Sequence, residues 1–382
     1  MLRHASILLI VCVGALVALG LTMLASTSVW ASESTTPYGL LLKQCIMFGV
    51  GLVIAICCVF IHQNTLRKFY PIILIAASIA LALCFVKGIG VEQWGSKRWI
   101  GIAGAGQIQP SEFAKIAVVL SLAGWFARWQ TETKTLWRGF IIPGAMAGVP
   151  VLLIMLESDV GTALSLAVVT GAIFFCVCVR LAYLVPTALG GMFAAAFYVY
   201  NDPNRWARIQ AWLDLENPAY SQSINFQHLH ALYALGNGGA TGVGLGNGVE
   251  KFGTLTLAYS DFILPAIGEE LGLVATLGIV ICYVLIAVCG VGIAVQADQV
   301  FNRCLALGLT CILVIPAMMH VGVTTALLPN DGVALPFVSY GGTNLVCSLI
   351  SVGLLVGIQR NTREVRALEY PLAREQRMAV RL

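Results

Sequence analysis

The chain has 382 residues, of which 59% are hydrophobic and only 10% are charged. Water-soluble domains average about 25% charged residues, so the composition excludes an ordinary soluble enzyme and indicates a protein embedded in a membrane. The formal net charge of +4 is small for so long a chain. It argues against nucleic-acid binding.

Apolar runs of about 20 residues make up most of the chain. Backbone groups in lipid must hydrogen-bond within the protein, which leaves helices or a closed barrel, and these runs are much longer than barrel strands. We therefore predict an all-α integral membrane protein, a single domain over residues 1–382, with ten transmembrane helices. The expected spans are residues 5–25, 39–61, 69–86, 110–128, 139–156, 160–179, 181–200, 269–294, 304–328 and 341–359.

The first apolar run resembles a secretory signal peptide, because Arg3 precedes it and Val29-Trp30-Ala31 resembles a cleavage site. Its length of about 21 residues exceeds the roughly 7–15 residues of a signal core. We expect an uncleaved first helix.

The distribution of Lys and Arg predicts the orientation. Fourteen of the 22 fall on one side of the membrane when the N-terminus is placed in the cytoplasm. Positive residues favour the cytoplasmic side, so we predict that both termini are cytoplasmic and that the polar segment 201–260, between the seventh and eighth helices, is extracytoplasmic. The basic tail, residues 360–382, is expected to lie on anionic lipid, with docking to a cytoplasmic partner as the alternative.

Twelve cysteines lie almost entirely within the predicted spans. We expect them to be small buried hydrophobic residues. The spacing of Cys176 and Cys178, without a nearby His, does not match a zinc site.

Charged residues begin the fourth predicted helix. Pro110 suits a first helical turn, and Glu112 and Lys115 are three residues apart, so they can pair on one face. Gln109 and Ser111 flank them. Two interpretations remain open: a structural ion pair, and a charged wall of a polar cavity.

Two further outer features could bind an anion or a metal. Lys97 and Arg98 lie in an outer loop against the positive-inside trend, so they could hold a phosphate or pyrophosphate, or only contact lipid headgroups. Asp159, in the short turn after Glu157, could cap the sixth helix or supply a carboxylate for acid–base or metal chemistry. These two roles of Asp159 are compatible.

The exit of the long outer segment holds the residue that we expect to be catalytic. Asp261 lies at the membrane surface, where partial burial would raise its pKa toward the range of a general base. Glu269 and Glu270 follow, and we expect them to cap or orient the eighth helix. Candidate ligand contacts elsewhere in the outer loops are Arg205, Arg208, Gln227, Ser339 and Tyr340.

Glycine and proline break the helical pattern at two outer places, residues 236–246 and 329–344. Glycine permits tight turns and close approach of the backbone to a ligand, although such loops are common and this one lacks the context of a nucleotide site. A broken helix at membrane depth can line a cavity. A simple re-entrant turn is the alternative.

These segments together resemble the SEDS proteins (shape, elongation, division and sporulation), the family of FtsW, RodA and SpoVE. The likeness covers nearly the full length. The matching segments are Trp99-Ile-Gly101, Gln109-Pro-Ser-Glu112-Phe-Ala-Lys115, Asp159-Val-Gly-Thr162, Gly242-Val-Gly-Leu-Gly246, Asp261-Phe262, Gly268-Glu-Glu-Leu-Gly272 and Leu335-Pro-Phe-Val-Ser-Tyr-Gly-Gly342.

The resemblance implies a peptidoglycan glycosyltransferase of the bacterial cytoplasmic membrane that polymerises lipid II at its outer face. Its partners would be a class B penicillin-binding protein and, at the septum, other division proteins. The family's essential Asp falls on Asp261, its charged helix pair on Glu112 and Lys115, and its short-turn Asp on Asp159.

The leaving pyrophosphate would need positive charge, either from Lys97, Arg98, Arg205 or Arg208 or from a divalent cation, Mg or Mn. No organic cofactor is expected.

The chain departs from the family pattern at three places. Tyr259-Ser260 stands where His-Thr is usual, Ser158 where Pro is usual, and His320 where Asn is common. No carboxylate is lost. The alternatives that remain open are a RodA-type elongation enzyme, a lipid II flippase and a non-catalytic division scaffold, and we favour the FtsW-type division enzyme.

Overall fold

The structure is a computed structural model. It describes residues 4–30, 38–93, 96–102, 106–215, 226–252, 254–255, 257–330 and 332–379. The long helices are α1 (Ala5–Thr27), α2 (Gly39–Phe60), α3 (Gln63–Leu83), α4 (Pro110–Arg128), α5 (Ile142–Leu156), α6 (Val160–Cys176), α7 (Leu181–Tyr200), α11 (Ile263–Gln296), α12 (Val300–Thr324) and α13 (Gly342–Ala379). Short helices are η2 (Ser28–Trp30), η3 (Gln130–Glu132), the π-helical turn η4 (Trp137–Ile141), α8 (Pro203–Leu213) and α10 (Phe226–Gly238).

Eight helices in the described part are long and apolar enough to cross a membrane. The prediction of a helical membrane protein is therefore confirmed. The two other predicted spans coincide with α4, which carries two charged residues near its start, and with α6, which has 17 residues. The count of ten spans stays a prediction.

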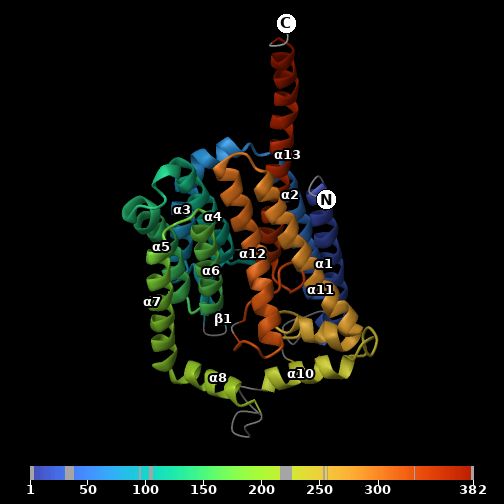
Figure 1. The fold of residues 1–382 in the computed structure, drawn as a ribbon. Coiled ribbons are helices and arrows are strands. Elements are labelled where there is room, and N and C mark those ends of the chain that lie inside the picture. Colours follow the sequence, from blue (N-terminus) through green and yellow to red (C-terminus); the bar gives the residue numbers. More distant parts are fainter. Residues whose placement is uncertain are drawn as a thin grey trace.

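The helices form one upright bundle (Figure 1). The start of α1 and the end of α13 lie at one end of the bundle, and α8 and α10 lie at the other. Helix α13 packs on α2, α11 on α12 and α1, and α4 on α3 and α12. Close approach depends on small residues: a Cβ added at Gly353 of α13 would lie 2.3 Å from the Ala55 carbonyl oxygen of α2.

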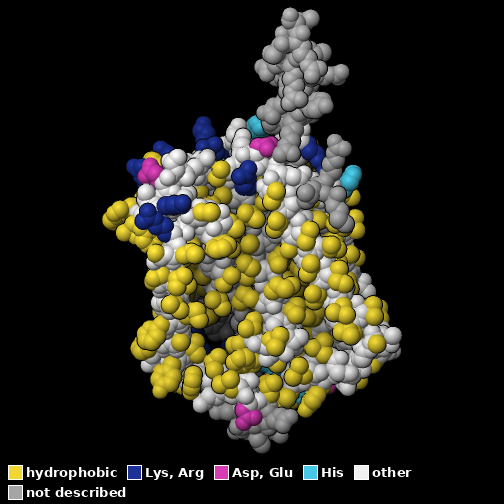
Figure 2. All heavy atoms as spheres, viewed as in Figure 1, with side chains coloured by type: hydrophobic (Ala, Val, Ile, Leu, Met, Phe, Trp, Pro, Cys, Tyr) yellow, Lys and Arg dark blue, Asp and Glu magenta, His cyan; other side chains and the backbone are white. Residues whose placement is uncertain are grey.

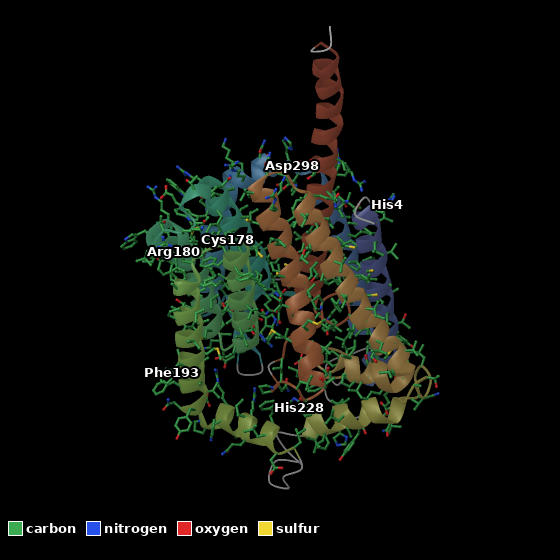
Figure 3. The ribbon with its side chains drawn as sticks, in the orientation of Figure 1. His4, Cys178, Arg180, Phe193, His228 and Asp298 are labelled. Atoms are coloured by element: carbon green, nitrogen blue, oxygen red, sulfur yellow. The ribbon has the colours of Figure 1, made fainter. Side chains whose placement is uncertain are left out.

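A broad band of hydrophobic side chains covers the visible face of the bundle, and Lys and Arg gather beyond it at the end where the termini lie (Figure 2). His4 and Asp298 lie at that end, and His228 lies at the opposite end (Figure 3). The described parts of the segment 201–260 thus lie opposite the start of α1 and the end of α13, as the basic residues predict. Which side of the membrane each end faces stays a prediction. We call the end with α8 and α10 the outer end, after the predicted orientation.

The outer loop before α4 contains β-structure, so the expectation of an all-α fold is wrong here. Strands β1 (Gly90–Gln93), β2 (Ser96–Ile102) and β3 (Gly106–Ile108) form a three-stranded antiparallel sheet in chain order. These strands lie outside the spans, where neighbouring backbones satisfy one another's hydrogen bonds. Successive side chains of a strand point to opposite faces, which separates Lys97 from Arg98.

Several helix boundaries differ from the predicted spans. Helix α3 begins at Gln63 and α11 at Ile263, each six residues before the predicted start, because hydropathy does not detect polar first turns. Helix α13 continues to Ala379, so the predicted tail 360–382 is largely a helical extension. Helix α11 has a kink at Gly272, where φ is 76°.

Helix α7 lies at the edge of the bundle. None of its residues is buried, and Phe193 is 75% exposed. The surface is hollowed beside α7, above α8 (Figure 2). Near its start, Tyr183 and Leu184 pack against the core. The exposed remainder of the helix is stable in lipid because its side chains are apolar and its backbone bonds are internal.

The twelve cysteines are all free. Four of them, Cys45, Cys57, Cys176 and Cys178, are exposed, so the expectation that the cysteines are buried is wrong for these. An apolar thiol can face lipid as readily as the protein interior.

Candidate functional site

Asp261 lies in the turn immediately before α11 and is partly exposed. Its Oδ1 accepts a hydrogen bond of 2.8 Å from the Ser260 hydroxyl. Gly332, which has a φ of 69°, lies near the other carboxylate oxygen of Asp261, Oδ2. A Cβ atom added to Gly332 would be 3.5 Å from this oxygen. The carboxylate is thus held between its own turn and the last outer loop.

The last outer loop is fastened to the Asp261 turn by hydrogen bonds. The Ser339 hydroxyl donates to the Ser260 carbonyl oxygen at 2.7 Å and accepts from the Leu335 amide at 2.9 Å. The Tyr340 amide donates to the Tyr259 carbonyl oxygen at 2.9 Å, and the two Tyr rings meet edge to face. Ser339 and Tyr340 are therefore close to Asp261 and position it.

Other elements hold the same loop from behind. Gln44 of α2 donates to the Ser339 carbonyl oxygen at 3.2 Å, and His320 of α12 pairs through Nδ1 with the Val333 carbonyl oxygen at 2.8 Å. Trp212 of α8 donates to the Ala326 carbonyl oxygen at 2.8 Å. The loop is thereby fixed to both the bundle and the outer helices.

The electrostatic surroundings of Asp261 include a cation and a second carboxylate. Burial raises the pKa of Asp261, and the negative charge of Asp159 raises it further. The hydrogen bond from Ser260 and the positive charge of Arg98 lower the pKa. Because burial is the largest influence, the pKa lies above its ordinary value. A raised pKa makes the ionised carboxylate a stronger base.

Asp159 forms the centre of a second cluster beside Asp261. Its Oδ1 accepts from the Thr162 amide at 3.2 Å, so the predicted N-cap of α6 is confirmed. Its Oδ2 lies 3.5 Å from Arg98 Nη1 of β2 and accepts from Gln109 Nε2 at 3.2 Å. Gln109 Nε2 also donates to the Ser111 hydroxyl at 3.0 Å.

Glu112 and Lys115 form the predicted ion pair, with 2.9 Å between Nζ and Oε2, and both are buried. Asn344 of α13 donates to Glu112 Oε2 at 3.2 Å. The amide of Gln109 donates to Thr343 Oγ1 at 3.2 Å. These contacts tie the start of α4 to the start of α13, which supports the structural interpretation of the pair.

Four other predicted contacts lie elsewhere at the outer end. Lys97 is exposed and pairs with Glu92 at 3.7 Å. Arg205 of α8 pairs with Asp202 at 3.0 Å, while Arg208 of α8 is exposed and Gln227 of α10 is half-buried. Among the described residues, Arg98 is the cation whose charge acts on Asp261.

Glu269 and Glu270 lie within α11, before its kink at Gly272, so they do not cap its start at Ile263. They hold the glycine-rich segment instead. Glu269 Oε1 accepts from the Val249 amide at 2.9 Å, and Glu270 Oε2 accepts from the Gly246 amide at 2.8 Å. The two carboxylates thus shape the loop that leads to Asp261.

Lys251 completes this cluster and was not predicted as a site residue. Its Nζ lies 2.6 Å from Glu270 Oε1 and donates to Ser26 Oγ of α1 at 2.9 Å. It also donates to the Gly246 carbonyl oxygen at 2.8 Å. Its position on the outer side, against the positive-inside trend, was the signal that could have identified it.

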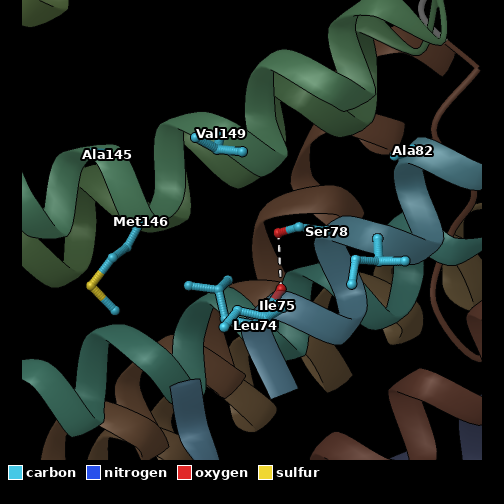
Figure 4. Close-up of a pocket in the computed structure, with 8 residues that line it drawn as sticks. Leu74, Ile75, Ser78, Ala82, Ala145, Met146 and Val149 are labelled. Carbon is cyan, nitrogen blue, oxygen red and sulfur yellow. Dashed lines mark hydrogen bonds between the residues drawn. The ribbon is translucent and has the colours of Figure 1, made fainter. Parts of the chain in front are cut away.

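An apolar groove opens on the membrane-facing side between α3 and α5 (Figure 4). Its volume is about 470 Å³. The Ser78 hydroxyl bonds to the Leu74 carbonyl oxygen at 2.9 Å, so the lining offers no free donor there. The lining residues are Leu74, Ile75, Ser78, Ile79, Ala82, Ala145, Met146 and Val149.

The family of the chain is shown by comparison with known proteins. The family model of cell cycle proteins, covering FtsW, RodA and SpoVE, matches residues 6–364. The chain belongs to this family. A probable peptidoglycan glycosyltransferase FtsW of Trichlorobacter lovleyi is 34% identical over 359 residues, 94% of this chain and 93% of the relative.

Further family relatives agree in length and fold. Stage V sporulation protein E of Bacillus subtilis is 32% identical over 94% of this chain and 97% of its own. The crystal structure of the rod shape determining protein RodA of Thermus thermophilus matches with a TM-score of 0.68 at 25% identity, covering 93% of this chain and 96% of RodA. A chain from a peptidoglycan synthase complex matches with a TM-score of 0.77 at 24% identity, covering 93% and 97%, which shows a common fold.

Proposed function

We propose that this family member is a peptidoglycan glycosyltransferase that polymerises lipid II at the outer face of the bacterial cytoplasmic membrane. The observation that carries the proposal is the partly exposed Asp261 carboxylate at the outer end, beside Arg98 and Asp159. The names of the FtsW relatives support the activity. Glycan-strand formation from lipid II by the purified chain tests it.

In the proposed reaction the 4-hydroxyl of the acceptor GlcNAc attacks the anomeric carbon of the lipid-linked donor. Asp261 accepts the hydroxyl proton, a new glycosidic bond forms, and the bond to the pyrophosphate breaks. The donor linkage is α and the product linkage is β, so one inverting displacement suffices. Asp261 needs no covalent bond to the sugar.

The departing pyrophosphate needs positive charge, and we assign this role to Arg98. A guanidinium can bind phosphate oxygens through two parallel donors. The Asp159 carboxylate, 3.5 Å away, holds it in place. The pyrophosphate would then lie next to the attacked carbon and to Asp261.

Replacing Arg98 with Gln is expected to lower kcat/KM for lipid II by about 10²-fold, the usual effect of removing one donor to a developing anion. Arg98→Lys should recover part of the loss. Lys87→Gln, which removes an exposed cation of the same loop, is the matched control and should leave kcat/KM unchanged. Equal activity of Arg98→Gln and wild type would exclude this role.

A divalent cation would have to be shared with the substrate. Among the described residues, no group of three His, Cys, Asp or Glu could hold a metal. Mg²⁺ is often held by one or two carboxylates together with substrate phosphates, so Asp159 and Asp261 are the oxygen ligands that fit. Bound there, the ion would neutralise negative charge on the pyrophosphate.

We place the hydrocarbon tail of the substrate in the apolar groove between α3 and α5. The groove faces the membrane, and α3 leads from Ala82 at its edge toward the sheet that carries Arg98. A tail in the groove would reach the outer surface near this sheet. Burial of apolar surface would favour binding by about 25 cal/mol per Å².

Filling the groove with Ala145→Phe is expected to raise KM for lipid II several-fold, with kcat nearly unchanged, because uniform binding is lost. Ala195→Phe on the exposed helix α7 is the control for an added aromatic ring in lipid. The measurement is the KM against lipid II in reconstituted membranes. An unchanged KM for Ala145→Phe would exclude the groove.

The remaining assignments concern assembly and cellular role. We propose a class B penicillin-binding protein as partner, since a fold relative acts in a complex of polymerization and crosslinking. With both termini cytoplasmic, the site would face outward. The FtsW relatives favour septal synthesis with other division proteins.

Charged residues gather at the outer end, in the ion pairs Arg98–Asp159, Glu112–Lys115 and Lys251–Glu270. This clustering favours an enzyme over a transporter.

A further inference from the structure

The glycine-rich segment, residues 236–252, places its polar and apolar side chains in the reverse of the order usual for a loop in water. Val243, Leu245 and Val249 are 42%, 53% and 66% exposed. Lys251, by contrast, is buried. A loop surrounded by water keeps its charged side chains on the outside. The segment therefore fits surroundings that are apolar on its outer side.

Both charged residues of this segment are turned inward and paired. Glu250 is partly buried, and its Oε2 lies 2.6 Å from Nδ1 of His230 on α10. Lys251 Nζ lies 2.6 Å from Glu270 Oε1 of α11. The segment has no other charged residue. Its exposed side is therefore uncharged, and its apolar side chains belong to a contact that needs no ion pair.

Backbone hydrogen bonds join the segment to the kink of α11. Gly272 has a φ of 76°, which interrupts the regular bonding of the helix. The Glu269 carbonyl oxygen accepts a hydrogen bond of 2.9 Å from the Val243 amide, and the Leu273 amide donates to the Gly239 carbonyl oxygen at 2.9 Å. The segment thus completes the bonding on both sides of the kink, which fixes its level along α11.

This kink marks the outer limit of the lipid-facing side of α11. The exposed apolar side chains of the helix extend from Leu273 to Val295, a length of roughly 33 Å at 1.5 Å per residue. The hydrocarbon core of a bilayer is about 30 Å thick. Residues 263–270, before the kink, are buried in the protein. The outer edge of the hydrocarbon therefore falls near Leu273, beside which the segment lies at the rim of the bundle (Figure 1).

The polar backbone of the segment is bonded within the protein, as a position away from water requires. The Glu269 carboxylate accepts from the Val249 amide at 2.9 Å, and the Glu270 carboxylate accepts from the Gly246 amide at 2.8 Å. Lys251 donates to the Gly246 carbonyl oxygen at 2.8 Å. Buried carboxylates are costly, and water could serve these amides in an immersed loop. Their use here supports a segment that water does not reach.

We propose that the glycine-rich segment is a membrane-binding loop that inserts Val243, Leu245 and Val249 into the outer leaflet beside α11. The surface that it contacts is the boundary between lipid headgroups and acyl chains, into which interfacial elements reach by about 5–10 Å. Because the exposed side carries no charge, the contact is apolar and needs no anionic lipid. The insertion is a property of the folded chain and does not depend on polymerisation of lipid II.

The first test replaces Leu245 with a fluorescent amino acid whose emission depends on polarity, in the full chain reconstituted into phosphatidylcholine nanodiscs. We expect blue-shifted emission that acyl-chain nitroxide lipids quench and that aqueous iodide leaves nearly unchanged. The same probe at Leu277, exposed on the lipid-facing side of α11, should behave alike. At Glu92, an exposed charged position of the outer sheet, iodide should quench and the nitroxide lipid should not.

The opposite result at Leu245 would overturn the proposal. Emission that matches the Glu92 probe, quenched by iodide and not by the lipid, would place the segment in water and leave its apolar side to a protein partner. The probe at Val249, the most exposed of the three apolar positions, gives a second reading if the Leu245 variant does not fold. Neither reading involves turnover, so the result is separate from the test of the proposed function.

The second test changes the lipid charge. Quenching at Leu245 should be the same in nanodiscs of phosphatidylcholine and in nanodiscs of equal parts phosphatidylcholine and phosphatidylglycerol, and added salt should not reduce it, because an apolar contact is not screened. Quenching that requires phosphatidylglycerol or that salt abolishes would contradict an apolar insertion. It would show instead that a charged headgroup holds the segment at the membrane.

Discussion

Replacing Asp261 with Asn is expected to lower the rate of polymerisation by about 10²–10⁴-fold, the usual contribution of a general base. The amide cannot accept the hydroxyl proton, whereas its shape preserves the hydrogen bond of 2.8 Å from Ser260. The KM for lipid II should therefore change less than kcat. The measurement is kcat and KM for lipid II, with the folded fraction checked by thermal unfolding.

The control for this prediction is Asp298→Asn. Asp298 is an exposed carboxylate at the opposite end of the bundle (Figure 3), and its replacement should leave kcat unchanged. Asp261→Glu keeps the carboxylate but moves it, so it should retain part of the activity. If Asp261→Asn polymerises as fast as wild type, another group is the base.

The second large effect is expected in stability. Lys251→Met leaves Glu270 buried and without its cation, at a side-chain exposure of 0%. Breaking a buried ion pair in this way costs about 3–5 kcal/mol. The glycine-rich segment should loosen, because Lys251 also holds the Gly246 carbonyl oxygen and Ser26. Thermal unfolding of the purified protein, followed by Trp fluorescence, measures the loss.

A double replacement separates the ion pair from general damage. Lys251→Met with Glu270→Gln removes both charges, so it should be more stable than Lys251→Met alone. Lys134→Met, at an exposed position between α4 and α5, is the control for the loss of a Lys. If Lys251→Met melts like Lys134→Met, the pair does not hold the loop.

Features that depend on neighbours in the sequence could be predicted. The pairing of Glu112 with Lys115 follows from their spacing on a helix, and the cap at Asp159 follows from its position before an apolar run. Both are present in the structure. The membrane class followed from the low charged fraction together with the long apolar runs, since lipid demands long apolar helices.

Contacts between distant segments could not be predicted. Lys97 and Arg98 are adjacent and chemically alike, but the alternation of strand β2 sends only Arg98 toward Asp159. The sheet itself was missed because its pairing is a tertiary property of a short outer loop. The expectation that Glu269 and Glu270 cap the start of the eighth helix is wrong because α11 begins earlier than hydropathy indicates.

The environment of Asp261 illustrates the same limit. Its position at the exit of the outer segment singled it out, yet its surroundings come from elements far apart in the chain, Gly332 and Arg98 among them. Polar residues inside apolar runs, such as Gln44, were the remaining sequence signal for contacts that hold the Asp261 surroundings. They are costly in lipid unless they bond within the protein, and Gln44 does so with the last outer loop.

The most direct test of the central claim is glycan-strand formation from lipid II by the purified chain, with and without a class B penicillin-binding protein and Mg²⁺ or Mn²⁺. We expect polymer with β linkages from wild type. We expect almost none from Asp261→Asn under the same conditions. The absence of polymer from folded wild type, with both the partner and the divalent ion present, would contradict the claim and favour a transporter or a scaffold.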